Sequence, residues 1–273
     1  MSSPESDTIF AGSIPRLYEE YLVPLIFQPY ADDLASRLAA SRPLSRVLEI
    51  AAGTGVLTRR LTSALSEDVT IVATDLNRPM LDMAAKIGTS RPVEWHQADA
   101  MQLPFGEAQF DAVVCQFGVM FFPDKPKAFS EAFRVLRPGG VLLFSVWDRI
   151  EENEFAHTVE TALESLFPDD PPRFMARTPH GYHDLARIER DLRSSGVVTS
   201  PHVHTVAQRS AAASPRIPAL AYCQGSPLRN EIETRGKTRL GEATELAAAA
   251  IAERFGSGPV DSKIQAHVVT LER

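Results

Sequence analysis

The chain has 273 residues, of which 44% are hydrophobic, and its 28 basic and 35 acidic side chains give a net charge of −7. This length suffices for a globular core, and the acidic balance disfavours a nucleic-acid partner. Cys115 and Cys223 lack paired or metal-ligand spacing, so we predict neither a disulfide framework nor a metal site. The sequence shows no signal peptide and no apolar run of membrane-spanning length, which predicts a cytoplasmic protein without stable membrane insertion.

Strand and helix patterns alternate between residues 46 and 147. Short apolar segments rich in β-branched residues predict five fully buried strands, at 46–50, 69–75, 93–99, 110–116 and 140–147. Helical patterns lie between them, at 55–66, 78–87 and 125–136. Such alternation is typical of parallel strands joined by right-handed crossovers. Ligands are therefore expected beyond the carboxyl ends of the strands.

The pattern loosens after residue 148. Helices are predicted at 152–167 and 183–196 with a proline-rich loop between them, and the last two strands at 201–209 and 263–273. A helical insertion separates those strands, and its second helix carries an apolar stripe at Leu240, Ala243, Ala247, Ile251 and Phe255.

These elements predict an α/β fold, with a doubly wound, mostly parallel, seven-stranded sheet. A helical cap is expected from the N-terminus and from insertions after strands 5 and 6. We expect one domain over 1–273, whose core is 40–150, 183–212 and 262–273 and whose cap is 10–35, 150–182 and 213–258.

The stretch "EIAAGTG", residues 49–55, places a glycine-dotted turn between the first strand and the first helix. Gly53 and Gly55 let the backbone approach a ligand closely, and the free N–H groups of the helix attract a negative group. A tight turn without any ligand has the same requirements, so both interpretations stay open at this point.

Three acids lie on the predicted ligand face. Asp75 ends the second strand, where a carboxylate can accept hydrogen bonds from both hydroxyls of a ribose; a helix N-cap is its structural alternative. Asp99 follows the third strand and can accept a bond from an adenine amine. Glu49 lies on the first strand, and burial of its charge would require loop amides or a ligand as partners.

Residues 46–148 resemble the class I S-adenosylmethionine-dependent methyltransferases, in particular the small-molecule branch that includes the quinone-biosynthesis C-methyltransferases. The family motif is an acid followed by three alternate glycines, and it is present here as Glu49, Ala51, Gly53 and Gly55, with alanine at the first glycine. The small Cβ of Ala51 leaves room for a cofactor but tightens its approach at that point.

The resemblance implies a Rossmann-like methyltransferase sheet that binds S-adenosylmethionine and releases S-adenosylhomocysteine. By position, residues 51–55 would contact the methionine end of the cofactor, Asp75 the ribose and Asp99 the adenine amine. Leu76, Ala100 and Met101 would complete the adenine pocket. Gln116 and Phe117 take the place beside the methionine group and the methyl acceptor.

Two other functions were weighed. A nicotinamide-dependent oxidoreductase shares the sheet and the turn, but its third glycine is replaced by Thr58 or Val56 in the two reading frames. A catalytically inactive S-adenosylmethionine-binding protein stays open, because methyl transfer requires few special side chains. We predict an enzyme that methylates a small, partly hydrophobic metabolite. The oligomeric state stays open, with a homodimer as one option.

No catalytic residue is fixed by the sequence. Methyl transfer is an in-line displacement that depends on alignment, and a general base helps only when the acceptor is a hydroxyl or an acidic carbon. Tyr21, on a predicted N-terminal helix, and His180 and His183, on a loop, are weak candidates. Arg229 can anchor an anion or pair with Glu231 or Glu233.

Overall fold

The computed structural model describes residues 7–273, and its chain divides into two compact units. The core unit comprises residues 28–146, 182–206 and 266–273. The cap unit comprises, among the described residues, 7–27, 147–181 and 207–265. The first six residues of the predicted 1–273 domain lie outside the described part of the chain, and the single-domain organisation stays a prediction.

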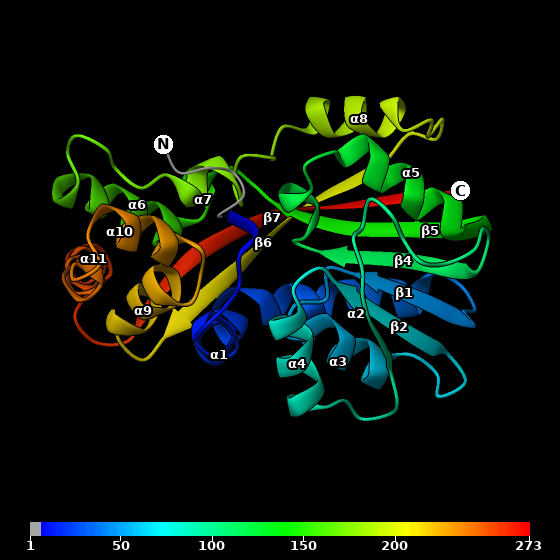
Figure 1. Cartoon of the computed structure of the whole chain (residues 1–273), viewed down its shortest axis with the longest axis horizontal. Helices are drawn as coiled ribbons and strands as arrows, with labels where there is room; N and C mark the ends of the chain where they lie inside the picture. Colours follow the sequence, from blue (N-terminus) through cyan, green and yellow to red (C-terminus); the bar gives the residue numbers. More distant parts are fainter. Residues whose placement is uncertain (1–6) are drawn as a thin grey trace. The chain divides into compact units, whose positions relative to one another are not determined.

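The described residues form a seven-stranded sheet with the order β3-β2-β1-β4-β5-β7-β6 (Figure 1). Its strands are β1 Arg46–Ile50, β2 Thr70–Asp75, β3 Glu94–Gln97, β4 Phe110–Gln116, β5 Leu136–Trp147, β6 His202–Ala212 and β7 Val260–Glu272. The pairs β1–β2, β1–β4, β2–β3 and β4–β5 are parallel. The bond from the Arg273 N–H to the Gly140 carbonyl and the bond from the Asp148 N–H to the Gln265 carbonyl make β7 antiparallel to β5. The predicted mostly parallel α/β fold is confirmed.

The helices predicted at 55–66, 78–87, 125–136, 152–167 and 183–196 are present, and the structure contains others that the sequence did not predict. The helices are α1 Ile14–Leu17, the π-helix η2 Tyr18–Phe27, α2 Gln28–Ser41, α3 Val56–Ala64, α4 Arg78–Ile87, η3 Val119–Phe121, α5 Lys125–Val135, η4 Ile150–Glu152, α6 Glu154–Leu166, α7 Phe174–Arg177, α8 Leu185–Ser194, α9 Arg216–Gln224, α10 Leu228–Arg235 and α11 Leu240–Phe255. The predicted loop at 167–182 therefore contains the short helix α7. The helix that carries Tyr21 is wound as a π-helix, a form found mostly as short turns at functional sites.

The central strands of the core unit are apolar because both of their faces are covered. Val47 to Ile50 of β1 are all buried, and so are the last five residues of β4. The prediction of a fully buried strand at 93–99 was wrong: Glu94, His96 and Gln97 of β3 are exposed. This strand is at the edge of the sheet, where only one neighbour pairs with it, so polar residues are tolerated.

In the cap unit, α11 packs against α6 and α9, and α10 lies beside α9 (Figure 1). Ala243, Ala247 and Ile251 are completely buried, which confirms the apolar stripe predicted for α11. Phe255 ends the stripe with an edge-on ring contact to Phe155 of α6, at a centroid distance of 5.0 Å. Small alanine side chains allow these helices to approach one another closely.

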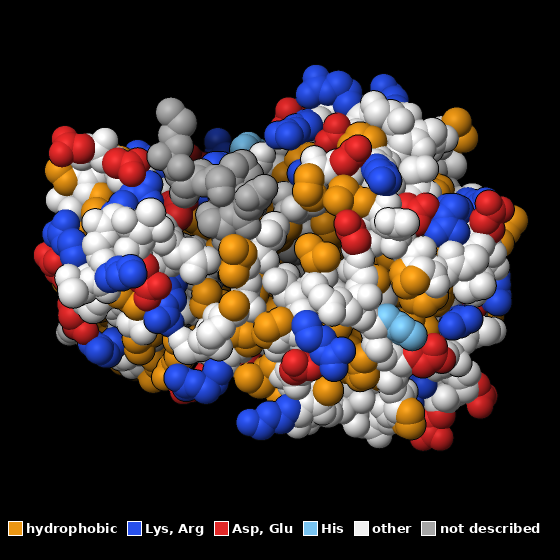
Figure 2. All heavy atoms as spheres, viewed as in Figure 1, with side chains coloured by type: hydrophobic (Ala, Val, Ile, Leu, Met, Phe, Trp, Pro, Cys, Tyr) orange, Lys and Arg blue, Asp and Glu red, His pale blue; other side chains and the backbone are white. Residues whose placement is uncertain are grey.

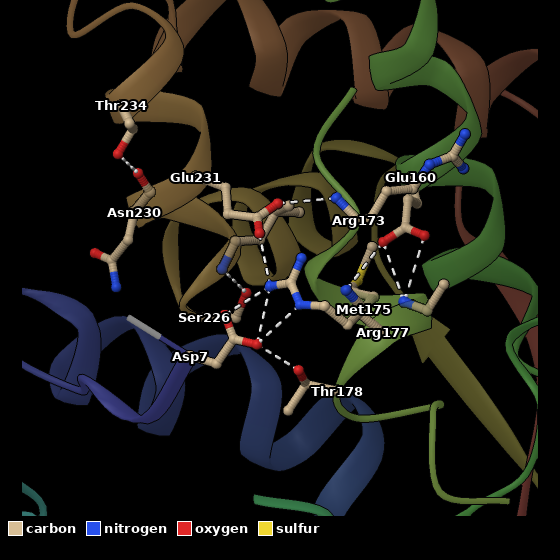
Figure 3. Close-up of polar contacts among 12 residues, drawn as sticks. Asp7, Glu160, Arg173, Met175, Arg177, Thr178, Ser226, Asn230, Glu231 and Thr234 are labelled. Atoms are coloured by element: carbon tan, nitrogen blue, oxygen red, sulfur yellow. Dashed lines mark hydrogen bonds and ion pairs between the residues drawn. The ribbon is translucent and has the colours of Figure 1, made fainter. Parts of the chain in front are cut away.

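An ionic cluster around two buried acids ties together distant segments of the cap unit (Figure 3). The Arg177 guanidinium donates to Asp7 Oδ1 and to Glu231 Oε1, both at 2.7 Å. Thr178 also donates its hydroxyl to Asp7, and the Arg173 N–H donates to Glu231 at 2.8 Å. The side chains of Asp7 and Glu231 are buried, with exposed fractions of 3% and 1%. We call the five residues Asp7, Arg173, Arg177, Thr178 and Glu231 the Arg177 cluster.

The surface carries charges of both signs. On the face shown in Figure 2, Lys and Arg side chains lie among Asp and Glu side chains. None of the helices within residues 7–273 is long and apolar enough to cross a membrane.

Arg229 donates to Glu233 at 2.8 Å, one of the two partners that the sequence suggested, whereas Glu231 belongs to the Arg177 cluster.

Candidate cofactor site

The turn after β1 is built on left-handed backbone. Ala51, Gly53 and Gly55 have φ angles of 56°, 58° and 82°. Two backbone bonds of 2.9 Å hold it, from the Ala52 N–H to the Thr74 carbonyl and from the Gly55 N–H to the Ala52 carbonyl. A left-handed conformation is unfavourable for a residue with a Cβ, by about 1 kcal/mol. Ala51, which replaces a family glycine, therefore holds strain at the start of the turn.

Gly55 allows the turn to pack against its neighbours. A Cβ at this position would lie 3.1 Å from Cη2 of Trp95 on β3 and 3.3 Å from the Cβ of Ala84 on α4. The space beside Gly55 is thus filled by protein side chains. Its left-handed φ and this close contact both require glycine.

Glu49 is 1% exposed and accepts a hydrogen bond of 2.6 Å from the Thr58 hydroxyl on α3. Burial raises the pKa of Glu49 to about 8, opposed by the Thr58 bond and by the charge of Arg59. The carboxyl is therefore mostly protonated at neutral pH. The Thr58 hydroxyl is a partner of Glu49 that the sequence analysis did not name.

Asp75 links the end of β2 to the turn. Its Oδ2 accepts the Gly53 N–H at 2.8 Å, and its Oδ1 accepts the Asn77 N–H at 2.7 Å. Burial raises the pKa of Asp75, and the bonds from Asn77 and Gly53 oppose that rise. Asn77 occupies the N-cap position of α4, although its side chain makes no capping bond. A carboxylate has about four acceptor positions, so Asp75 has capacity for further donors.

The segment after β3 lies at the same edge of the sheet, where the strands have their carboxyl ends. The Ala98 N–H donates to the Asp75 carbonyl at 3.0 Å, and the Met101 N–H donates to Asp99 Oδ1 at 2.8 Å. Ala100 is 7% exposed, whereas Leu76 beside Asp75 is 53% exposed. An exposed leucine next to a buried acid gives this edge both an apolar surface and a hydrogen-bond acceptor.

The segment after β4 is also strained. Phe117 has a φ angle of 53°, which is rare for a bulky residue. Its N–H lies 3.1 Å from the Ser145 carbonyl and 3.3 Å from the Ser145 hydroxyl, and its ring meets Tyr30 edge-on at 5.2 Å. Gln116, which precedes it, is 9% exposed. Strained residues of this kind persist where their surroundings hold them, often at functional sites.

The eleven predicted cofactor residues thus lie at or just beyond the carboxyl ends of four neighbouring strands, β3, β2, β1 and β4. Sequence reasoning missed Thr58, Ser145, Tyr30 and Gly118. The Thr54 hydroxyl is buried without a hydrogen-bond partner inside the turn, so it can accept or donate a bond to a polar ligand. Thr58 pairs with Glu49, nine residues away, and Ser145 pairs with Phe117, 28 residues away. No local spacing in the sequence signals such pairs.

The three base candidates are divided between the two units. Tyr21 and His180 belong to the cap unit, and His183 to the core unit. A hydrogen bond to Glu20 is the main cause that raises the pKa of Tyr21. His180 is 6% exposed, its Nδ1 lies 2.8 Å from the Asp148 carbonyl, and its ring is 6.0 Å from that of Trp147. Since a carbonyl only accepts, Nδ1 carries the proton and the lone pair of the neutral ring is on Nε2.

Residues 48–144 match the family model described as "Methyltransferase domain". The ubiquinone/menaquinone biosynthesis C-methyltransferase UbiE of Pseudomonas savastanoi pv. phaseolicola is 41% identical over 139 residues, which are 50% of this chain and 49% of that protein. UbiE of Wigglesworthia glossinidia brevipalpis is 39% identical over 108 residues, 38% of this chain and 43% of that protein. The chain thus spans about half the length of these curated relatives.

Solved structures share the fold. Phosphoethanolamine N-methyltransferase 2 of Haemonchus contortus, solved with S-adenosyl-L-methionine, has a TM-score of 0.60 at 16% identity and covers 100% of this chain and 60% of its own. The YcgJ protein of Bacillus subtilis has a TM-score of 0.56 at 17% identity, and the match covers 90% of this chain and 98% of the YcgJ chain. Residues 48–144 thus match a methyltransferase domain and are similar in sequence to the UbiE C-methyltransferases, and the solved structures share the fold of this chain.

Proposed function

We propose that the protein transfers the methyl group of S-adenosylmethionine to a small, partly hydrophobic acceptor and releases S-adenosylhomocysteine. The observation that carries this proposal is Asp75, a buried carboxylate that braces the Gly53 turn through one oxygen and retains acceptor capacity at the end of β2. In this fold, that position suits the two hydroxyls of a ribose.

The other residues fit the same cofactor. Asp99 offers a carboxylate for the adenine amine, and Leu76 offers exposed apolar surface that a base would cover. The buried Thr54 hydroxyl, which has no hydrogen-bond partner among residues 7–273, suits a polar group at the methionine end. Gln116 and Phe117 would lie beside the methionine group and the acceptor. Bound S-adenosylmethionine would supply an activated methyl group on a positively charged sulfur.

The residues of the chain would then act by alignment and by exclusion of water. The strained Phe117, held by Ser145 and Tyr30, would keep its ring in one place against the acceptor. If the acceptor is a hydroxyl or an acidic carbon, a base must take its proton. His180, His183 and Tyr21 are the candidates, and the bond of His180 to the Asp148 carbonyl places the lone pair of its neutral ring on Nε2.

The names of the UbiE relatives suggest a quinone-like aromatic acceptor methylated on carbon; a small thiol or amine is the other class that we propose to test. We further propose that the protein works in the cytoplasm. Cys115 and Cys223 are buried free cysteines, and burial raises the pKa of each thiol to about 12. Free thiols suit a reducing compartment.

Isothermal titration with S-adenosylmethionine, S-adenosylhomocysteine and NAD tests the donor. We expect micromolar binding of the first two and none of NAD. Binding of NAD alone would contradict the proposal and favour hydride transfer. A second assay follows a labelled methyl group onto quinone-like aromatics, thiols and amines. Tight binding of S-adenosylmethionine without transfer to any of them would favour a binding protein without catalysis.

A further inference from the structure

The loops after β1 and β4 touch at Ala51 and Gly118. A Cβ built on Gly118 would lie 2.5 Å from the Ala51 Cβ and 2.7 Å from the Cys115 Sγ. Real Cβ atoms do not approach this closely, so the Ala51 methyl occupies the space that a side chain at position 118 would require. The methyl group that alanine has and glycine lacks thus lies between the two loops.

Gly118 is not required by its backbone. Its φ and ψ angles of −99° and −35° are open to any residue. Glycine is needed there because the Ala51 methyl and the Cys115 sulfur leave no space. Ala51, by contrast, has a left-handed backbone that glycine would adopt more readily.

The loop after β4 cannot move away freely from Ala51. Its Phe117 N–H is held by both the carbonyl and the hydroxyl of Ser145, and its ring contacts Tyr30, which is completely buried. A bulky residue at Gly118 would therefore have to displace either the strained turn or this anchored loop.

We propose that Ala51 and Gly118 form a matched pair of positioning residues. The alanine methyl packed on the glycine sets the separation between the cofactor turn and the loop that carries Gln116 and Phe117. The expected effect on cofactor affinity rests on the proposed function, whereas the expected effect on stability does not.

A double-mutant cycle tests the pair. Gly118→Ala should lower Tm by about 5 °C, because overpacking a filled site is destabilising. The same variant should weaken S-adenosylmethionine binding about tenfold in calorimetry. Adding Ala51→Gly should recover part of both losses, since it removes one of the two obstacles and leaves the Cys115 sulfur.

Two variants serve as matched controls. Ala108→Gly relieves the same kind of strain, since Ala108 has a φ angle of 52°, but it lies on the exposed segment before β4. Gly258→Ala adds a methyl where no atom lies within 4 Å. We expect Ala108→Gly to raise Tm by the same small amount in the unaltered protein and in Gly118→Ala and to leave the loss of affinity in place, and Gly258→Ala to leave Tm and affinity unchanged.

The outcomes separate the two proposals. If Gly118→Ala behaves like Gly258→Ala, or if Ala108→Gly rescues it as well as Ala51→Gly does, the matched pair is wrong. If Gly118→Ala fails to fold, recovery of a folded protein by Ala51→Gly supports the pair, and failure to recover it contradicts the pair. If the unaltered protein does not bind S-adenosylmethionine, the proposed function fails, while the Tm cycle still decides the pair.

Discussion

Asp75 of the core unit and the two acids of the Arg177 cluster in the cap unit are buried carboxylates held in different ways. Asp75 in the core unit accepts backbone N–H groups from Gly53 and Asn77 and keeps acceptor capacity. Asp7 and Glu231 in the cap unit share the Arg177 guanidinium and accept further protein donors. A carboxylate held by neutral amides stays available to a ligand, whereas one that is ion-paired in a cluster serves the structure.

Removal of Arg177 should give the clearest distinction between the two units. Arg177→Met removes the ion-pair partner of the buried Asp7 and the nearer of two cations beside Glu231, whose other cation, Arg235, lies at 3.9 Å; we therefore expect a loss of about 3 kcal/mol in the free energy of unfolding. Cofactor affinity should stay within about twofold, well below the tenfold that 1.4 kcal/mol represents. Urea unfolding and calorimetry measure the two quantities. Adding Glu231→Gln should restore part of the stability; no restoration would argue against an electrostatic origin.

Asp75→Ala should have the reverse profile. It removes a charged acceptor from the proposed ribose site, so binding of S-adenosylmethionine should weaken at least about tenfold. Asp75→Asn, which keeps one acceptor oxygen, should have a smaller effect. Calorimetry measures both. Unchanged affinity in the alanine variant would rule out the ribose assignment.

Each unit also contains a buried glutamate that titrates near neutral pH. Burial raises the pKa of Glu49 to about 8 and that of Glu160 to about 7, from 4.5; the Ala176 and Met175 N–H groups oppose the shift at Glu160. Because both folded pKa values exceed the unfolded value, the native state binds more protons and stability falls as pH rises from about 4.5 to those values.

Glu49→Gln and Glu160→Gln should each remove one part of this pH dependence. The slope lost is about 1.4 kcal/mol per pH unit within each window. For Glu49→Gln the loss should extend to about pH 8, and for Glu160→Gln only to about pH 7. Urea unfolding at a series of pH values measures it, with the unaltered protein alongside. Parallel curves for all three proteins would show that neither carboxyl titrates in this range.

The smallest effect is expected at Arg229. Its pair with Glu233 is one turn apart on α10 and partly exposed, so Arg229→Ala should lower the stability by about 0.5 kcal/mol. Methyl transfer should be unchanged. A several-fold rise in the KM of an acceptor would instead support the anion-anchor alternative.

Much of the core unit could be predicted from its sequence, because its strands are continuous apolar runs and its turn contains glycines at characteristic positions. The exposed edge strand β3 was misjudged, since Trp95 and Val93 resemble a buried strand while sheet order decides which strands lie at an edge. The π-helix around Tyr21 has no periodic signal that distinguishes it from an α-helix.

The contacts that shape the candidate site were harder to foresee. Thr58 meets Glu49 across nine residues, and Gly118 meets Ala51 across two loops. The sequence pointed to the acids and glycines because each has a distinctive chemistry. It could not reveal partners whose selection depends on available space, such as Gly118, or on the closure of a loop, such as Ser145.

The contact of Trp95 with Gly55 has an optical consequence. The chain has two tryptophans, and Trp95 lies in the core unit while Trp147 lies in the cap unit. Trp147→Phe would leave a single indole whose edge rests on the glycine turn, and Trp95→Phe would leave one packed on Phe27 in the cap. Each variant would emit from one unit alone, so fluorescence could follow the local opening of the turn and of the cap as separate events.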